Sequence, residues 1–120
     1  MRVRDELREC IIDCIRGCDL SRWEIAGQMS NLLDQEITIH QINAWTAESK
    51  EGHRFPAEYL PAFCEAVGCH DPMKLLAEKA GMFLIPGDDA LRVEKAREME
   101  SMKRSKDRIR RIDAILEASS

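Results

Sequence analysis

Four polar residues that lie close together in the sequence carry side chains suited to paired hydrogen bonding: Thr38, His40, Gln41 and Asn43. The amides of Gln41 and Asn43 each hold a donor beside an acceptor, which matches the major-groove edge of adenine, and His40 can donate or accept. We therefore treat these residues as candidates for contact with DNA bases. The alternative is that they are solvated polar residues on an ordinary surface helix, with Gln41 already engaged in capping.

Three cations near this stretch are candidates for phosphate contact: Arg22, Lys50 and Arg54. Arg22 is expected at a helix start, where backbone N–H groups also favour an anion. Four nearby glutamates, among them Glu24 and Glu48, oppose phosphate binding. Any affinity for nucleic acid must therefore come from a local face.

A second basic patch lies near the C-terminus, where six cations fall within nine residues. They are Lys103, Arg104, Lys106, Arg108, Arg110 and Arg111. Such a patch can bind a phosphate backbone or an acidic partner. The competing interpretation is the solvated outer face of a coiled coil, in which carboxylates such as Asp107 neutralise their neighbours.

Two capping-box patterns predict helix starts, one before the candidate base contacts and one among them. Ser21 followed by Glu24, and Thr38 followed by Gln41, have the spacing of a capping box. Apolar residues then recur at helical spacing, as Ile25, Met29, Leu32 and Leu33 in the first helix and Ile39, Ile42 and Trp45 in the second. The short link 35–37 predicts that the two helices pack at a steep angle as a helix-turn-helix, with Trp45 in the core.

The segment from Leu20 to Gly81 resembles the lambda repressor and Cro-like helix-turn-helix family. The resemblance is carried by Ile25-Ala26, Ile37-Thr38, Ile42 with Trp45, Gly52 and Pro56. The sequence departs from the family by about one extra helical turn at 30–35 and another at 47–51, and Thr46 stands where many members carry Glu. The run WTAESKEGHRFPAEYLP also resembles small regulators of Mu-like prophages. The resemblance implies a DNA-binding regulator.

The rest of the chain also predicts helices. Residues 4–18 place six apolar residues on one stripe: Leu7, Cys10, Ile11, Cys14, Ile15 and Cys18. Pro56 is expected to begin a helix over 56–67 that ends at Gly68, and Asp71-Pro72 to cap a helix over 73–80 that ends at Gly81. We predict an all-α fold, in which a helix-turn-helix bundle of about five helices is followed by a long C-terminal helix.

Three segments follow from these elements: a helix-turn-helix domain at 1–81, a connector at 82–88 and a C-terminal helix at 89–120. The connector includes Met82–Ile85, expected as a buried connector or a strand-like edge, and Asp88 or Asp89 is expected to cap the final helix. In that helix Met102, Ile109 and Leu116 repeat every seven residues, with Ile112 between them. This pattern predicts a short coiled coil and a homodimer.

The cysteines are expected to be free thiols, because five is an odd number for a disulfide framework. Cys10, Cys14 and Cys18 could in principle ligate a metal, with Cys64 and Cys69 adding to them. A straight helix does not form the usual zinc knuckle, however, and cysteine buries as readily as the larger aliphatics. The sequence interpretation is core packing, with no metal and no cofactor.

The charge balance and the N-terminus limit the class of protein to which this chain can belong. Of the 120 residues 18 are Lys or Arg and 22 are Asp or Glu, a net charge of −4. Residues 1–81 hold nine basic and fourteen acidic residues, a net of −5. The charged N-terminus and the lack of a long apolar run predict a cytoplasmic protein without a signal peptide or membrane span.

The histidines His40, His53 and His70 have no nucleophile or carboxylate pattern around them, and no Gly-rich phosphate loop is present. We therefore expect no enzyme and no small-molecule substrate. The expected function is that of a sequence-specific DNA-binding transcriptional regulator that binds double-stranded DNA. The alternative is a protein-interaction adaptor that keeps the fold without reading DNA.

Overall fold

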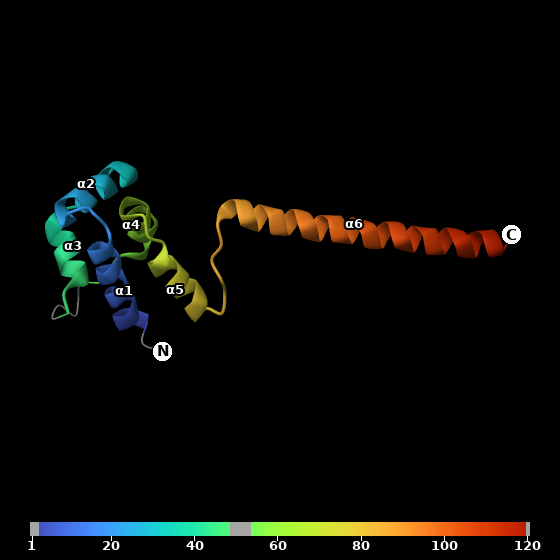
Figure 1. Ribbon diagram of the computed structural model, residues 1–120, viewed down its shortest axis with the longest axis horizontal. Coiled ribbons are helices and arrows are strands. Elements are labelled where there is room, and N and C mark those ends of the chain that lie inside the picture. Colours follow the sequence, from blue (N-terminus) through green and yellow to red (C-terminus); the bar gives the residue numbers. More distant parts are fainter. Residues whose placement is uncertain (1–2, 49–53, 120) are drawn as a thin grey trace. The chain divides into compact units, whose positions relative to one another are not determined.

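The computed structural model describes residues 3–48 and 54–119. Within these ranges all regular secondary structure is helical, with six α-helices, one short 3-10 helix and no strand (Figure 1). The predicted all-α class with a long final helix is confirmed. The chain divides into two units, Met1–Leu84 and Ile85–Ser120.

The first unit contains five α-helices and the 3-10 helix. They are α1 (Val3–Gly17), α2 (Arg22–Leu33), α3 (Ile39–Thr46), η1 (Ala57–Tyr59), α4 (Leu60–Val67) and α5 (Asp71–Lys79). Helix α1 packs against α5 and α3, α2 packs against α4 and α3, and α4 packs against α5. The pair α2–α3 is thus held from two sides, by α4 and by α1.

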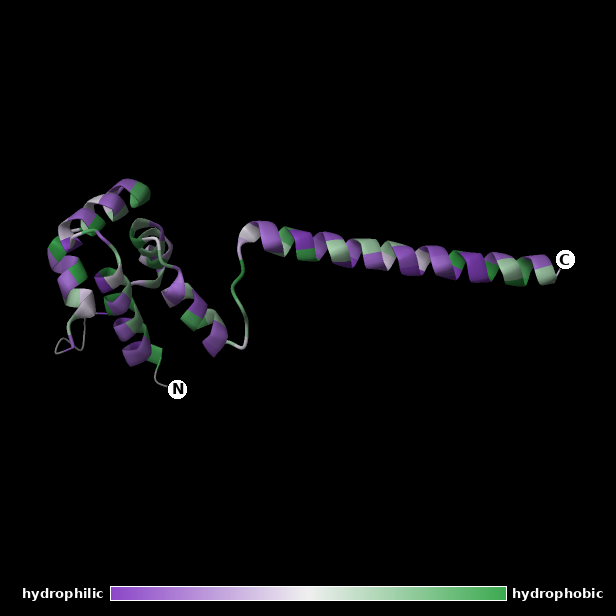
Figure 2. Ribbon diagram, in the orientation of Figure 1, coloured by the Kyte–Doolittle hydropathy of each residue, from purple (hydrophilic) through white to green (hydrophobic). Residues whose placement is uncertain are grey.

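The core of this unit is formed by one apolar stripe on each helix. Figure 2 shows hydrophobic and hydrophilic residues alternating along the ribbons. Its largest fully buried side chains include Ile11, Ile25, Met29, Ile42 and Phe63. Ile11, Ile25, Met29 and Ile42 lie on the apolar stripes predicted from the sequence.

Leu32 is an exception to the predicted core, because its side chain is 54% exposed. The contact one turn after Met29 is made by Leu33, which is partly buried against the core. Adjacent residues on an α-helix point about 100° apart, so Leu33 turns inward and Leu32 does not.

Trp45 was expected in the core and is only partly buried at its edge. Its ring meets Phe55 at a centroid distance of 4.9 Å and Tyr59 at 5.7 Å. Phe55 in turn contacts the buried Phe63 edge-on at 5.3 Å. This aromatic cluster connects α3 to the segment before α4.

Two helix starts in the first unit differ from the prediction. The helix expected over 56–67 is a 3-10 turn at Ala57–Tyr59 followed by α4, so Pro61 falls in the first turn of α4, where no internal N–H is needed. Asp71 is the first residue of α5 rather than its cap. His70 occupies the cap position without a side-chain hydrogen bond.

Glycines end α4 and α5 as predicted. Gly68 and Gly81 have φ angles of 69° and 76°, a left-handed conformation that glycine adopts without steric cost. After α5 the Met82 N–H donates to the Ala77 carbonyl at 2.8 Å, which closes the last turn.

The extra turn expected after Thr46 is absent where the structure describes the chain. Helix α3 ends at Thr46, because Ala47 is extended with φ −80° and ψ 127°. Residues 49–51 of the predicted turn lie outside the described ranges. The extra turn after Met29 does form, since α2 continues to Leu33 and closes with Asp34 in the left-handed region at φ 51°.

The connector 82–85 is neither buried nor a strand. Its four apolar residues are all exposed, with Phe83 the most exposed at 85%. After the bond from the Met82 N–H to the Ala77 carbonyl, described residues 83–85 make no backbone hydrogen bond to another segment. No sheet edge therefore forms.

The second unit is essentially one helix, α6 (Gly87–Ala118), which begins after Pro86. Asp88 and Asp89 lie inside its first turn rather than at the cap, where their charges favour the positive end of the helix dipole. A single helix has no second element in its own unit against which to bury an apolar face. Its seam residues Met102, Ile109 and Leu116 are accordingly 57–61% exposed.

Candidate nucleic-acid interface

The start of α2 is fixed by a capping box. The Ser21 hydroxyl accepts the Glu24 N–H at 3.1 Å, and the Glu24 carboxylate accepts the Ser21 N–H at 3.1 Å. The predicted cap is confirmed. Because this carboxylate serves the helix start, Glu24 is held in place rather than free to approach the face of α3.

The start of α3 has the same arrangement, which confirms the second predicted capping box. The Thr38 hydroxyl accepts the Gln41 N–H at 3.2 Å, and Gln41 Oε1 accepts the Thr38 N–H at 2.8 Å. Of the four candidate base contacts, Thr38 and Gln41 are thus already engaged with each other. The amide nitrogen of Gln41 makes no hydrogen bond to another described residue.

The link between α2 and α3 is tied to the end of α2 by Ser30. Its hydroxyl donates to the Ala26 carbonyl at 2.7 Å and accepts the Ile37 N–H at 2.8 Å. Ile37 itself is buried in the core. These contacts set the position at which α3 begins relative to α2.

His40 and Asn43 are the two exposed members of the candidate base-contact set. The His40 side chain makes no hydrogen bond to any other described residue, and its imidazole is exposed to solvent. Asn43 Oδ1 accepts a hydrogen bond from Arg22 Nη1 at 3.0 Å. A carbonyl oxygen has two lone pairs, so Asn43 keeps one acceptor site and both amide hydrogens for a further partner.

Arg22 forms a brace between α2 and α3 instead of a free phosphate contact. The same Nη1 that donates to Asn43 also donates to Thr46 Oγ1 at 2.7 Å. Thr46 is only 8% exposed, and its hydroxyl donates to the Ile42 carbonyl at 2.9 Å. Sequence reasoning did not predict this role of Thr46.

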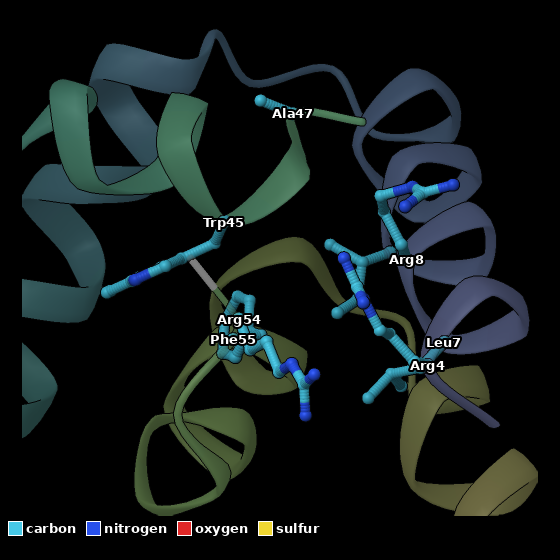
Figure 3. Close-up of a pocket in the computed structure, with 8 residues that line it drawn as sticks. Arg4, Leu7, Arg8, Trp45, Ala47, Arg54 and Phe55 are labelled. Atoms are coloured by element: carbon cyan, nitrogen blue, oxygen red, sulfur yellow. The ribbon is translucent and has the colours of Figure 1, made fainter. Parts of the chain in front are cut away.

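A pocket with three arginines lies beside the end of α3. Arg4 and Arg8 from α1 and Arg54 from the segment after α3 surround apolar walls that include Trp45 and Phe55 (Figure 3). Arg8 lies 3.4 Å from the carboxylate of Asp5, whereas Arg4 and Arg54 have no ion pair with a described residue. Three cations thus gather in a unit whose residues 1–81 carry a net charge of −5.

Arg4 and Arg8 were not among the predicted site residues. Their i, i+4 spacing on one helix was visible in the sequence, but their approach to Arg54 depends on the packing of α1 against α3. Of the predicted phosphate contacts, Arg54 is exposed, Arg22 is engaged in the brace and Lys50 lies outside the described residues.

The second basic patch forms part of α6, and all six of its cations are exposed. Arg104 lies 3.8 Å from Glu100, an exposed pair one turn apart. At about 100° per residue the six cations span an arc of about 200°, centred opposite the line of Met102, Ile109 and Leu116. The basic face and the apolar seam therefore occupy opposite sides of the helix.

The five cysteines are free thiols, and four of them lie around the junction of α1, α4 and α5. Burial raises the pKa of Cys64 from its ordinary 9.0 to about 11 and also raises the pKa of Cys10. Burial and the hydrogen bond from its thiol to Cys69, with the two sulfurs 2.8 Å apart, raise the pKa of Cys14 further. The Asp71 carboxylate completes a group with Cys14 and Cys69.

Comparison of the chain with protein-family models, with curated proteins and with solved structures found no match. Across residues 3–48 and 54–119, no helix combines the length and the apolar character needed to cross a membrane.

Proposed function

We propose that this chain is a sequence-specific, double-stranded-DNA-binding transcriptional regulator that places α3 in the major groove. The observation that carries the proposal is the α2–α3 pair, in which two capping boxes start the helices and the first turns of α3 expose His40 and Asn43. A helix is the element that the major groove admits, and residues near its N-terminus meet base edges. The resemblance to lambda repressor and Cro-like proteins supports the same function, and the resemblance of one run to regulators of Mu-like prophages supports a prophage origin.

Within this proposal the base contacts divide into two groups. Asn43 and His40 are the principal readers, because their side chains reach solvent. Arg22 orients Asn43 through its bond to Oδ1, which lowers the entropy lost when the amide pairs with a base. Thr38 and Gln41 hold the start of α3, and the Gln41 amide nitrogen is available for one further contact.

The phosphate contacts are assigned to Arg54, with Arg4 and Arg8 beside it, and to Lys50 as predicted from the sequence. Three cations in one pocket repel one another, and an anion near them relieves that repulsion. Backbone contacts of this kind supply affinity without sequence preference.

A homodimer formed through α6 belongs to the same proposal. The apolar seam of α6 has no partner within its own unit, and a second copy of the helix would bury it. Dimerisation doubles the number of base and phosphate contacts, which compensates for the few cations in each subunit.

A protein-interaction adaptor is the second candidate, and a specific observation favours it. The first unit is acidic, and three of the predicted DNA contacts, Arg22, Thr38 and Gln41, already bind other residues of the chain. An acidic surface repels phosphate, so such a unit binds DNA only through a local basic face.

Selection of bound sequences from a random duplex library distinguishes the two functions. The full-length chain should enrich a defined site, and Asn43→Ala should bind that site more weakly by about 1–3 kcal/mol while binding random duplex almost as before. Asn31→Ala, an exposed asparagine on α2, is the matched control and should bind like the parent chain. If no sequence is enriched, and neutralising the cations at 103–111 abolishes low-salt binding, the adaptor function replaces the proposal.

A further inference from the structure

Metal-ligating side chains from two separate segments meet where α1 packs against the α4–α5 turn. Cys14 comes from α1, Cys69 lies in the turn and Asp71 is the first residue of α5. The two sulfurs and a carboxylate oxygen of Asp71 all lie within 4.8 Å of one another. Cys14 and Cys69 were considered as metal ligands from the sequence, but Asp71 was not, because its place beside them depends on the packing of segments 57 residues apart.

The spacing of these atoms lies near that of ligands on one metal ion. Two thiolates bound to tetrahedral zinc at about 2.3 Å stand about 3.8 Å apart. The Cys14 and Cys69 sulfurs are 2.8 Å apart, which is closer than two unbonded sulfurs prefer, so a shared cation would require them to separate by about 1 Å. Side-chain rotation supplies such a movement without a change of backbone.

A fourth ligand is available one helical turn before Cys14. Cys10 has the i, i+4 spacing that puts two side chains on the same face of a helix, and it is partly buried at the same junction. Its sulfur lies outside the group of atoms that are within 4.8 Å of one another, so Cys10 has to move toward the other three ligands when the ion binds. Three sulfurs and one carboxylate oxygen form a donor set that suits zinc.

The surroundings of the group favour a cation and allow it to enter. A surface hollow beside the cluster is lined by residues that include Asp13, Cys14, Cys69 and Asp71, and none of its lining side chains is cationic. Cys14 is buried, Cys69 is partly buried and Asp71 is exposed, so the ligands run from the core to the surface.

We infer that Cys14, Cys69 and Asp71, with Cys10 as the fourth ligand, form a site for a thiophilic divalent cation of the zinc class. As each metal–sulfur bond forms, the thiol releases its proton to solvent. The bound ion would join α1 to the start of α5. Because α1 also packs against α3, the ion would stabilise the whole first unit, whether or not that unit binds DNA.

Cobalt titration of the reduced, metal-free full-length chain tests this inference. We expect one Co²⁺ per chain, with thiolate-to-cobalt charge-transfer absorption and the visible bands of tetrahedral coordination, both removed by one equivalent of Zn²⁺. Zinc should also raise the melting temperature. Cys69→Ser and Asp71→Asn should each weaken cobalt binding at least about tenfold.

Cys18→Ser is the matched control, because the Cys18 thiol donates to the Ile15 and Leu20 carbonyls and lies outside the group. It should keep full cobalt binding. Since Cys14→Ser removes a buried residue and can unfold the chain, the test depends on Cys69 and Asp71, which are less buried. A reduced protein without thiolate–cobalt absorption overturns the inference. It is also overturned if that protein binds no metal and forms only a Cys14–Cys69 disulfide with oxidised glutathione.

Discussion

At the scale of single residues, the contacts that matter most link side chains that no sequence pattern pairs. Arg22 and Asn43 were both predicted as DNA contacts, and the structure joins them to each other and to Thr46. Periodicity assigns a residue to one face of a helix, but it does not say which long polar side chain reaches across to a neighbouring helix. Lys50 lies in the segment that the structure does not describe and stays a prediction.

A double-mutant cycle on Arg22 and Asn43 measures the brace between α2 and α3. We expect Arg22→Ala to lower the free energy of unfolding by about 1–2 kcal/mol, because two hydrogen bonds from a charged donor are lost. Asn43→Ala should cost less, and the coupling energy should be about 0.5–1 kcal/mol, since Asn43 is exposed. Urea denaturation supplies the measurement, and strictly additive effects would show that the bond is not formed in solution.

Cys64 should react slowly with alkylating reagents in the folded chain. Its side chain is fully buried and its pKa is raised to about 11, whereas the thiolate is the form that reacts. At about pH 8 roughly one molecule in a thousand carries this thiolate. Iodoacetamide labelling followed by peptide mapping should find Cys64 unmodified in the native state and modified in urea, and rapid native labelling would contradict its place in the core.

At the scale of elements, the helix starts that carry local signals were predictable and the others were not. Ser21–Glu24 and Thr38–Gln41 specify their own hydrogen bonds within four residues, and both capping boxes form. The cap of α5 was misplaced by one residue and that of α6 by two or three, because Asp71, Asp88 and Asp89 can stabilise a helix either as a cap or from its first turn.

The capping box of α3 should carry a measurable share of the stability of the first unit. Thr38→Ala removes the acceptor for the Gln41 N–H and should lower the free energy of unfolding by about 1 kcal/mol. An eight-residue helix has few internal hydrogen bonds, so the loss should also reduce the helicity of α3. Ser101→Ala on the exposed face of α6 is the control and should change stability by less than about 0.5 kcal/mol. Equal stability of Thr38→Ala and Ser101→Ala in thermal melts would mean that the cap is dispensable.

At the scale of the whole molecule, the sequence predicted the long final helix and its seam from heptad spacing alone. The arginine pocket and the cysteine group depend instead on how α1 packs against α3 and α5, which no local pattern specifies. The base-contact set, the arginine pocket and the cysteine group therefore differ in origin. The base-contact residues lie within one helix, whereas the other two exist only after the bundle has folded.

The last prediction concerns α6 and connects oligomeric state to DNA affinity. Replacing Ile109 and Leu116 with Asn puts two amides into the proposed seam, and the full-length variant should be a monomer by light scattering when the parent chain is a dimer. Val93→Asn removes an exposed apolar residue on the opposite side of α6 and should remain dimeric. With the four phosphate contacts assigned to each subunit, the dimer should show a slope of log affinity against log salt of about −7, and the monomer about half of that. If the seam variant remains dimeric, the dimer interface does not lie on α6. If the variant is monomeric and keeps the full salt slope, one subunit makes all the phosphate contacts.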